Sequence, residues 1–211
     1  MVLEIRDIQA ELKPYGVEAS LELCASIQRY IALLMRWNKR ISLTTVTDPA
    51  EVVRFHFGES LFAASAVSIR GGRLADVGSG AGFPGLALRL ADPDLRVTLI
   101  ESNVKKATFL SEIVRDLKLD HVTVSRARMG DFSSAANGFD FVTARALGKH
   151  DELLTWASKT LSGSGRVILW LGEDDCTTIS RKSGWNWCNP THIPGSKRRF
   201  LLAGSLNSQQ A

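Results

Sequence analysis

Residues 76–85, DVGSGAGFPG, constrain the fold more than any other part of the chain. An apolar segment at 73–77 precedes this run, and a helical pattern begins at Gly85. Glycines between a strand and a helix let the backbone turn sharply and approach a ligand closely. The run therefore predicts a ligand-binding loop at the end of a strand.

Two loop motifs overlap in this run. The G-x-G-x-x-G pattern of dinucleotide-binding enzymes would use Gly80, Gly82 and Gly85. The D-x-G-x-G-x-G pattern of methyltransferases would use an acid and three glycines, Asp76, Gly78, Gly80 and Gly82. The acid at the strand end distinguishes the two motifs.

Asp76 and Pro84 favour the methyltransferase motif. A carboxylate would repel an anionic pyrophosphate, whereas it favours the positive sulfonium and ammonium groups of S-adenosylmethionine. Pro84 has no backbone N–H to donate to a phosphate at the start of the helix. The chain is therefore predicted to bind S-adenosylmethionine through Gly78, Gly80 and Gly82.

Glu101 is the second predicted cofactor-binding group. It ends the apolar segment 96–100 and follows the glycine loop by roughly 20 residues, the spacing expected for an acid that holds ribose hydroxyls. A glutamate at a strand end can also be merely solvated, but the glycine loop favours the ribose role.

Strand and helix patterns alternate after residue 70. Apolar segments predict strands at 73–77, 96–100, 122–125, 139–143 and 166–171, with weaker signals at 191–193 and 198–203. Helical patterns begin at Gly85 and cover 104–117, 152–161 and, more weakly, 173–182. This alternation predicts an α/β fold of the Rossmann-like class I methyltransferase type, with a mainly parallel sheet covered on both faces.

The N-terminal part reads as helices instead. Apolar residues recur at helical spacing between Leu21 and Met35, and Asp48-Pro49 has the pattern of a helix start. We predict an N-terminal helical segment at 1–70 packed on a Rossmann-like domain at 71–204, followed by a loose tail at 205–211. We expect the protein to be monomeric.

The composition predicts a cytoplasmic protein without a metal site or a membrane segment. Charged residues in the first eleven positions are unlike a secretory signal, and no apolar run approaches the roughly 20 residues of a membrane span. The cysteines at 24, 176 and 188 form no CxxC pair, and the histidines lack ligand-like spacing.

Basic residues without acidic partners mark the C-terminal part. Residues 176–211 contain no acid, in a chain of net charge +4, and they include Arg181, Lys182, Lys197, Arg198 and Arg199. This favours a polyanionic partner, although a merely solvated basic edge remains an alternative. Trp185 and Trp187 lie in the same part and could stack on RNA bases, although alternate tryptophans are more often one core ring and one exposed ring.

Several segments in order resemble the RsmG (GidB) family, which methylates N7 of a guanine in small-subunit ribosomal RNA. The resembling segments are WNK at 37–39, HFGESL at 56–61, GSGAGFPG at 78–85, ARA at 144–146 and, in the closing strand, PG at 194–195 with RFLL at 199–202. The chain departs from the family pattern at Ser42, Glu59, Arg128 and Leu171.

The resemblance implies roles for further residues. Gly78 and Phe83 would line the cofactor site, and Ala127 and Arg128 would lie beside adenine, where the family has a glutamate. Arg145 would contact the cofactor near the methyl-transfer face. The partner implied is small-subunit 16S ribosomal RNA, either free or in the assembling 30S subunit.

N7 of guanine carries a free lone pair at neutral pH, so its methylation requires no general base. Orientation in a dry pocket would supply the catalysis, and Arg145, after a strand's carboxyl end, is the predicted catalytic residue. Two alternatives stay open: a methyltransferase of another substrate, and a non-catalytic module that binds S-adenosylmethionine or RNA.

Overall fold

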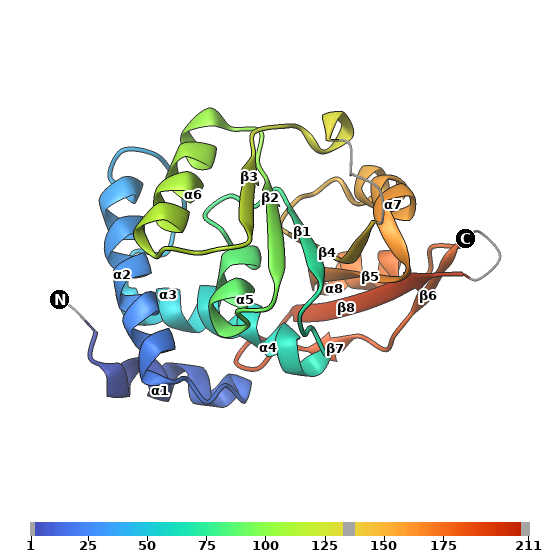
Figure 1. Cartoon of the computed structure of the whole chain (residues 1–211). Coiled ribbons are helices and arrows are strands. Elements are labelled where there is room, and N and C mark those ends of the chain that lie inside the picture. The colour runs from blue at the N-terminus through green and yellow to red at the C-terminus, as the bar shows by residue number, and fades with distance from the viewer. Residues whose placement is uncertain (1–2, 133–137, 208–211) are drawn as a thin grey trace.

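The structure is a computed structural model that describes residues 3–132 and 138–207. Its centre is one eight-stranded sheet in the order β3-β2-β1-β4-β5-β8-β6, with β7 paired to β8 (Figure 1). The strands are β1 Arg73–Val77, β2 Arg96–Ile100, β3 Val122–Ser125, β4 Phe139–Arg145, β5 Leu161–Gly172, β6 Trp185–Trp187, β7 Thr191–His192 and β8 Arg199–Leu206.

Strands β1 to β5 are parallel, so their carboxyl ends meet at one edge of the sheet, which we call the carboxyl edge. Strand β8 runs antiparallel to β5 and pairs Arg199 with Gly172, the last residue of β5. Because of this direction, β8 begins at the carboxyl edge. Residues 197–199 therefore lie at the same edge as the glycine loop.

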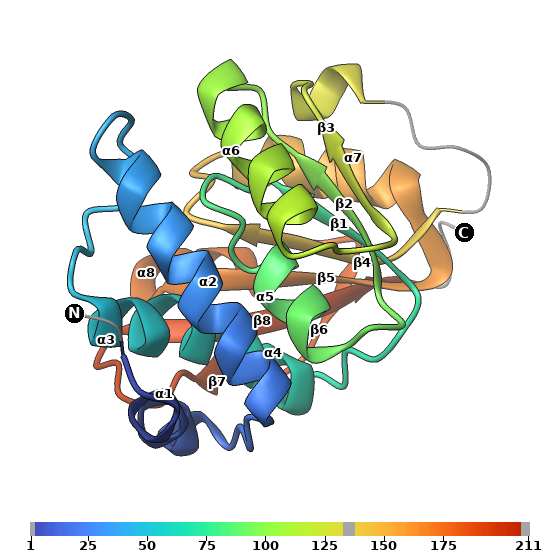
Figure 2. The ribbon, with the colours of Figure 1, turned by 60° about the vertical axis from the view of Figure 1, so that its left-hand side comes forward.

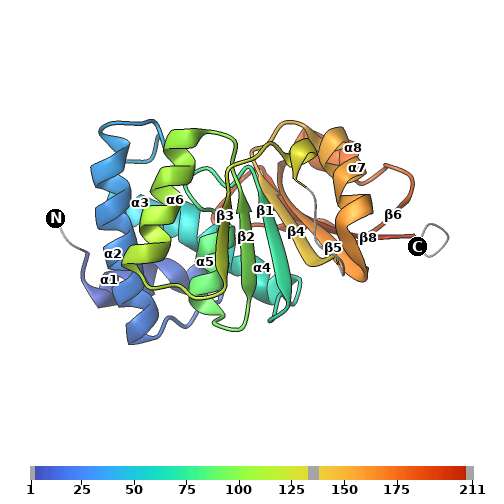
Figure 3. The same ribbon diagram turned by 45° about the horizontal axis from the view of Figure 1, so that its top comes forward.

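Helices cover both faces of the sheet (Figure 3). On one face lie α5 Gly85–Ala91 and α6 Val104–Asp116, and on the other α7 His150–Thr160 and α8 Glu173–Ile179. Each face has its own hydrophobic core, since alternate residues of the strands point to opposite sides.

The N-terminal helices lie on the same side of the sheet as α5 and α6. They are α1 Ile5–Leu12, the 3₁₀ turn η1 Lys13–Tyr15, α2 Leu21–Asn38, α3 Pro49–Val52, the π-helical turn η2 Val53–Gly58 and α4 Glu59–Ala66. The long helix α2 runs diagonally beside α5 in Figure 2. Ile27 of α2 and Leu61 of α4 belong to the same core as Leu86 of α5. The domain boundary at residue 70 stays a prediction.

Local sequence explains where several helices begin. The Ser20 hydroxyl accepts a hydrogen bond from the N–H of Leu23 at the start of α2. The carboxylate of Asp48, the residue before Pro49, accepts one from the N–H of Glu51 at the start of α3. The helix start predicted at Asp48-Pro49 is therefore confirmed. No helix in the described ranges is long and apolar enough to cross a membrane.

The predicted tail at 205–211 is wrong at its beginning. Strand β8 continues to Leu206, where Ser205 pairs with Arg166 and Leu206 with Trp185. The remainder of that tail, 208–211, lies outside the described residues. The sequence also missed β6, because three residues with a central asparagine carry no strand periodicity of their own.

Candidate active site

The glycine loop takes a backbone conformation that requires glycine. Gly78, Gly80 and Gly82 have φ angles of 70°, 55° and 88°, in the left-handed region. A side chain at Gly82 would also collide with the Tyr30 hydroxyl and with Leu86. The loop therefore lies close against α2 and α5.

Asp76 lies beneath this loop and not in front of it. The carboxylate is fully buried, accepts the Gly85 N–H at 3.2 Å, and accepts the Thr143 hydroxyl at 2.9 Å. Burial raises the pKa of Asp76 to about 6 against these hydrogen bonds. The expectation that Asp76 acts on the ligand's charge directly therefore needs correction, because its oxygens hold the start of α5 against β4.

Glu101 ties the loop to the next strand. One carboxylate oxygen accepts the Gly80 N–H at 2.9 Å, and the other accepts the Asn103 N–H at 2.8 Å. Only 7% of the residue is exposed. Each carboxylate oxygen can accept a second hydrogen bond, so Glu101 keeps the capacity to hold two hydroxyl groups.

A cavity of about 530 Å³ opens at the carboxyl edge beside Glu101. It lies among the loops that follow β1, β2, β3 and β4, where ligands bind in open α/β sheets. The predicted residues that line it are Gly78, Glu101, Ala127 and Arg128. Its volume falls within the range of roughly 300–1,000 Å³ that is usual for small-molecule sites.

Further residues in this cavity were not predicted from the sequence. They include the apolar Val77, Ile100, Met129 and Leu147, and the polar Ser102, Asp131, Lys149 and Glu152. Apolar walls with several carboxylates fit a nucleoside that carries a positive charge, so the residues present fit S-adenosylmethionine. A strand-end rule could have found Ser102, because it directly follows Glu101.

The other predicted cofactor residues do not line this cavity. Gly80 and Gly82 shape the loop behind it. Phe83 is buried in an aromatic cluster, with ring centroids 5.3 Å from Tyr30, 5.0 Å from Phe57 and 4.9 Å from His56. Direct contact of Phe83 with the cofactor stays a prediction.

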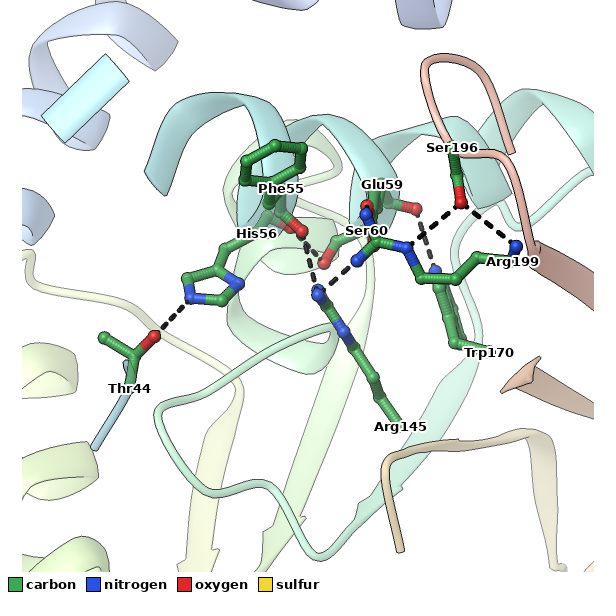
Figure 4. Close-up of polar contacts among 9 residues, drawn as sticks. All are labelled: Thr44, Phe55, His56, Glu59, Ser60, Arg145, Trp170, Ser196 and Arg199. Atoms are coloured by element: carbon green, nitrogen blue, oxygen red, sulfur yellow. Dashed lines mark hydrogen bonds and ion pairs between the residues drawn. The ribbon is translucent and has the colours of Figure 1, made fainter. Parts of the chain in front are cut away.

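Arg145 is the last residue of β4, which runs two residues beyond the predicted 139–143 because Ala144 and Arg145 pair with β5. Val77 pairs with Ala144, so Arg145 lies next to Gly78 across β1 and β4. Its guanidinium points to the N-terminal helices: Nη2 donates to the Phe55 carbonyl at 2.9 Å and lies 3.2 Å from Glu59 (Figure 4). Its predicted catalytic role is not tested by this geometry.

Glu59 joins three parts of the chain. Its side chain is only 1% exposed and forms ion pairs with Arg145 of β4 at 3.2 Å and Arg199 of β8 at 2.7 Å. The Trp170 indole donates to the Glu59 carbonyl at 2.9 Å. Burial raises the pKa of Glu59, and the two arginines oppose that rise. Sequence patterns could not reveal this cluster, because its members are far apart along the chain.

Other basic residues of the C-terminal part also find acidic partners. Lys182 pairs with Asp151, and Arg198 lies 3.7 Å from Glu173. The positive charge of this part is therefore partly balanced, but the exposed Lys197 and Arg198 remain at the carboxyl edge. No group of three or more potential metal ligands occurs within residues 3–132 and 138–207.

Trp185 and Trp187 stack on each other with centroids 5.5 Å apart, and both are half-buried. This differs from an arrangement of one core ring and one exposed ring. They pair with the end of β8 beside the start of β5, at the end of the sheet away from the glycine loop.

Comparisons with known proteins agree on a family. A family model described as GidB, rRNA small subunit methyltransferase G, matches residues 23–188. Relatives named ribosomal RNA small subunit methyltransferase G are similar over most of the chain. That of Chloroflexus aggregans is 34% identical, over 89% of this chain and 84% of its own. That of Xanthomonas axonopodis pv. citri is 37% identical, over 90% of each chain.

Solved structures resemble the fold. The glycopeptide N-methyltransferase MtfA complexed with sinefungin matches 72% of this chain and 87% of its own, with a TM-score of 0.61 and 13% identity. The ribosomal protein L11 methylase from Lactobacillus delbrueckii subsp. bulgaricus matches 73% and 79%, with a TM-score of 0.60 and 16% identity. At these identities the likeness shows the fold alone, and it confirms the predicted Rossmann-like methyltransferase class.

Proposed function

Because the chain belongs to the GidB family of ribosomal RNA small subunit methyltransferases, we propose that it transfers a methyl group from S-adenosylmethionine to N7 of a guanine in small-subunit ribosomal RNA. The observation that carries the proposal is the cavity beside Glu101, which lies at the same edge of the sheet as Arg145 and the basic start of β8. The cofactor and a nucleic acid can therefore meet there.

The cavity residues divide the binding of the cofactor between them. Glu101 accepts hydroxyl groups, while Gly78 leaves room for close approach of a ligand to the backbone. When bound, S-adenosylmethionine supplies a methyl group on a positively charged sulfur. The exposed Arg128 takes the place beside adenine, and Asp131 supplies a carboxylate in the same turn.

The protein's part in the reaction is orientation. The N7 lone pair of guanine forms the new bond to the methyl carbon, and the electrons of the broken carbon–sulfur bond go to sulfur. No proton has to leave before this step. Arg145 is proposed to orient the base, since its fixed planar guanidinium can position a group without exchanging protons.

The target guanine is proposed to be unpaired, because N7 in an A-form helix faces a deep and narrow groove. Exposed basic residues around the carboxyl edge, which include Lys105, Arg126, Lys197 and Arg198, would hold the flanking phosphates. We propose a monomer that acts in the cytoplasm, where small subunits assemble, on either free RNA or the assembling 30S particle.

Transfer of labelled methyl from S-adenosylmethionine tests the proposal. Small-subunit RNA and 30S particles from cells that lack the enzyme should gain label at N7 of one guanine. Label in another molecule would instead establish a different substrate. Cofactor binding without transfer to any substrate would establish a non-catalytic module.

A further inference from the structure

Two hydrogen-bond donors near the glycine loop lack partners among the described residues. They are Nδ1 of His56 and Nη1 of Arg145, both buried. The two side chains are neighbours, because Arg145 donates its other nitrogen to the carbonyl of Phe55, the residue before His56 (Figure 4). Buried polar groups are normally paired, so an unpaired donor calls for an explanation.

Thr44 contacts the other ring nitrogen of His56. The Thr44 hydroxyl oxygen accepts the Val46 N–H at 3.1 Å and lies 2.7 Å from Nε2 of His56. We assign the hydroxyl as the donor to Nε2, which places the proton of the neutral ring on Nδ1.

His56 is a neutral donor at physiological pH. Burial, followed by the charge of Arg145, lowers the pKa of His56 to about 4, while the Phe55 carbonyl opposes this shift. The imidazole therefore presents one N–H group without adding charge to the site.

The position of the donors relates them to methyl transfer. The His56 ring stacks on Phe83 of the glycine loop with centroids 4.9 Å apart and an interplanar angle of 30°. Arg145 lies beside Gly78 across β1 and β4. The two donors therefore adjoin the loop on its β4 side, while Glu101 adjoins it on the β2 side.

We propose that His56 and Arg145 together donate hydrogen bonds to O6 of the target guanine and so make the enzyme specific for guanine. On this edge guanine presents the acceptors O6 and N7, whereas adenine presents an amino donor at the position of O6. Two donors aimed at O6 would reject adenine and leave the N7 lone pair free to react. This assignment rests on the proposed function.

The charges of the cluster suit this role. Positive charge passes from sulfur to the base as the new bond forms, so an additional cation beside the base would oppose the reaction. His56 is neutral, and the Glu59 carboxylate lies against Arg145. Glu59 is thus a positioning residue that fixes the guanidinium and balances its charge.

The test combines His56 variants with a modified base. His56→Phe keeps a ring to stack on Phe83 but removes the donor. His56→Asn places an amide N–H near the position of Nδ1. The substrates are small-subunit RNAs with guanine or with 2-aminopurine, which lacks O6, at the methylated position.

The parent enzyme should methylate the 2-aminopurine RNA about 100-fold more slowly than expected from its intrinsic N7 reactivity, because two hydrogen bonds in a desolvated site are lost at about 10-fold each. His56→Phe should methylate the guanine RNA about 10-fold more slowly than the parent, and its guanine-to-2-aminopurine rate ratio should be about 10-fold smaller. His56→Asn should restore most of that ratio. Because intrinsic reactivity is the same for each enzyme, it cancels when ratios are compared.

His192→Phe is the matched control, since His192 is exposed and also contacts a phenylalanine ring, that of Phe200. It should behave as the parent. Calorimetry should give unchanged affinity for S-adenosylmethionine in all variants. An unchanged rate ratio in a folded His56→Phe enzyme would overturn the O6 assignment alone, as would a folded His56→Asn enzyme whose ratio is as small as that of His56→Phe. A parent that forms no N7-methylguanine would overturn the proposed function with it.

Discussion

Glu101 and Arg145 each combine a proposed functional role with a structural role, and mutation can separate the two. Glu101 both faces the cavity and fixes the backbone of the glycine loop through Gly80. Arg145 lies at the expected strand end but reaches toward the N-terminal helices. Each prediction at this scale therefore pairs a binding or rate measurement with a measurement of stability.

Glu101→Ala should weaken binding of S-adenosylmethionine. The variant loses charge-assisted hydrogen bonds to hydroxyl groups, each worth about 1.5–3 kcal/mol, and frees the loop. Calorimetry measures the affinity. The exposed Glu18 provides the control, because Glu18→Ala removes the same charge away from the cavity. Equal affinities in parent and Glu101→Ala would contradict the ribose assignment.

Arg145→Lys should reduce turnover about 100-fold, because lysine keeps the charge but loses the planar fork that we propose orients the base. The variant should also lose about 1 kcal/mol in free energy of unfolding, because a lysine cannot both donate to the Phe55 carbonyl and pair with the Glu59 carboxylate as the guanidinium does.

Arg89→Lys is the matched control for this substitution. Arg89 is also buried and donates to a carbonyl, that of Asp120, away from the site. Single-turnover rates and melting curves should show a similar loss of stability in both variants but a loss of rate only in Arg145→Lys. If Arg145→Lys kept the parental rate, the proposed catalytic role of Arg145 would be excluded and only its structural role would remain.

Asp76 predicts a pH effect on stability. Burial raises its pKa in the folded protein to about 6, above the ordinary value of 3.8, so the folded state binds this proton more tightly. The stability from this site is full below the unfolded pKa and is lost as pH rises toward 6. The loss amounts to about 3 kcal/mol.

The neutral Asp76→Asn isolates this contribution. The free energy of unfolding of the parent minus that of the variant should fall between pH 4 and pH 6. The comparison is needed because His56, with its lowered pKa, acts in the opposite direction over the same range. A difference that stays constant from pH 4 to pH 6 would refute the raised pKa.

At the scale of elements, sequence periodicity predicted those strands and helices whose position depends on residues close together in the chain. The strands β1, β2 and β3 and the start of α6 occur where their apolar patterns lie. The ends of β4, β5 and β8 extend beyond their patterns, because pairing with a neighbouring strand stabilises residues such as Arg145 and Ser205. The cluster of Glu59, Arg145 and Arg199 joins three segments that are distant in sequence, so no local sequence pattern predicts it.

Strand β8 allows a direct test of the corrected C-terminal boundary. A chain that ends at Gly204 loses the pairing of Ser205 with Arg166 and of Leu206 with Trp185. We expect it to melt several degrees below a chain that ends at Asn207, since 1 kcal/mol shifts the melting temperature of a domain this size by roughly 2–4 °C. Equal melting temperatures would support the original boundary at 204.

At the scale of the whole molecule, the direction of the strands decides where RNA can bind. Lys197 and Arg198 precede β8 at the carboxyl edge, whereas Arg70 and Arg96 lie at the opposite edge, before β1 and at the start of β2. All four side chains are exposed. The two pairs carry the same charge and differ in position, so they form a matched comparison.

Replacing Lys197 and Arg198 with alanine should weaken RNA binding and make it less sensitive to salt. Each lost phosphate contact lowers the slope of log affinity against log salt by about 0.7–0.9. Titrations at several salt concentrations measure the slope. The alanine variant at Arg70 and Arg96 should keep the parental slope, and equal slopes in both variants would remove the carboxyl edge as the RNA-binding face.

The ion pairs of Glu59 with Arg145 and Arg199 also make the site depend on the order in which the chain is synthesised. Arg199 belongs to the last strand, which leaves the ribosome after every other part of the site. A nascent chain that still lacks β8 holds Glu59 with one arginine instead of two. Glu59 therefore has both ion pairs only after β8 has left the ribosome.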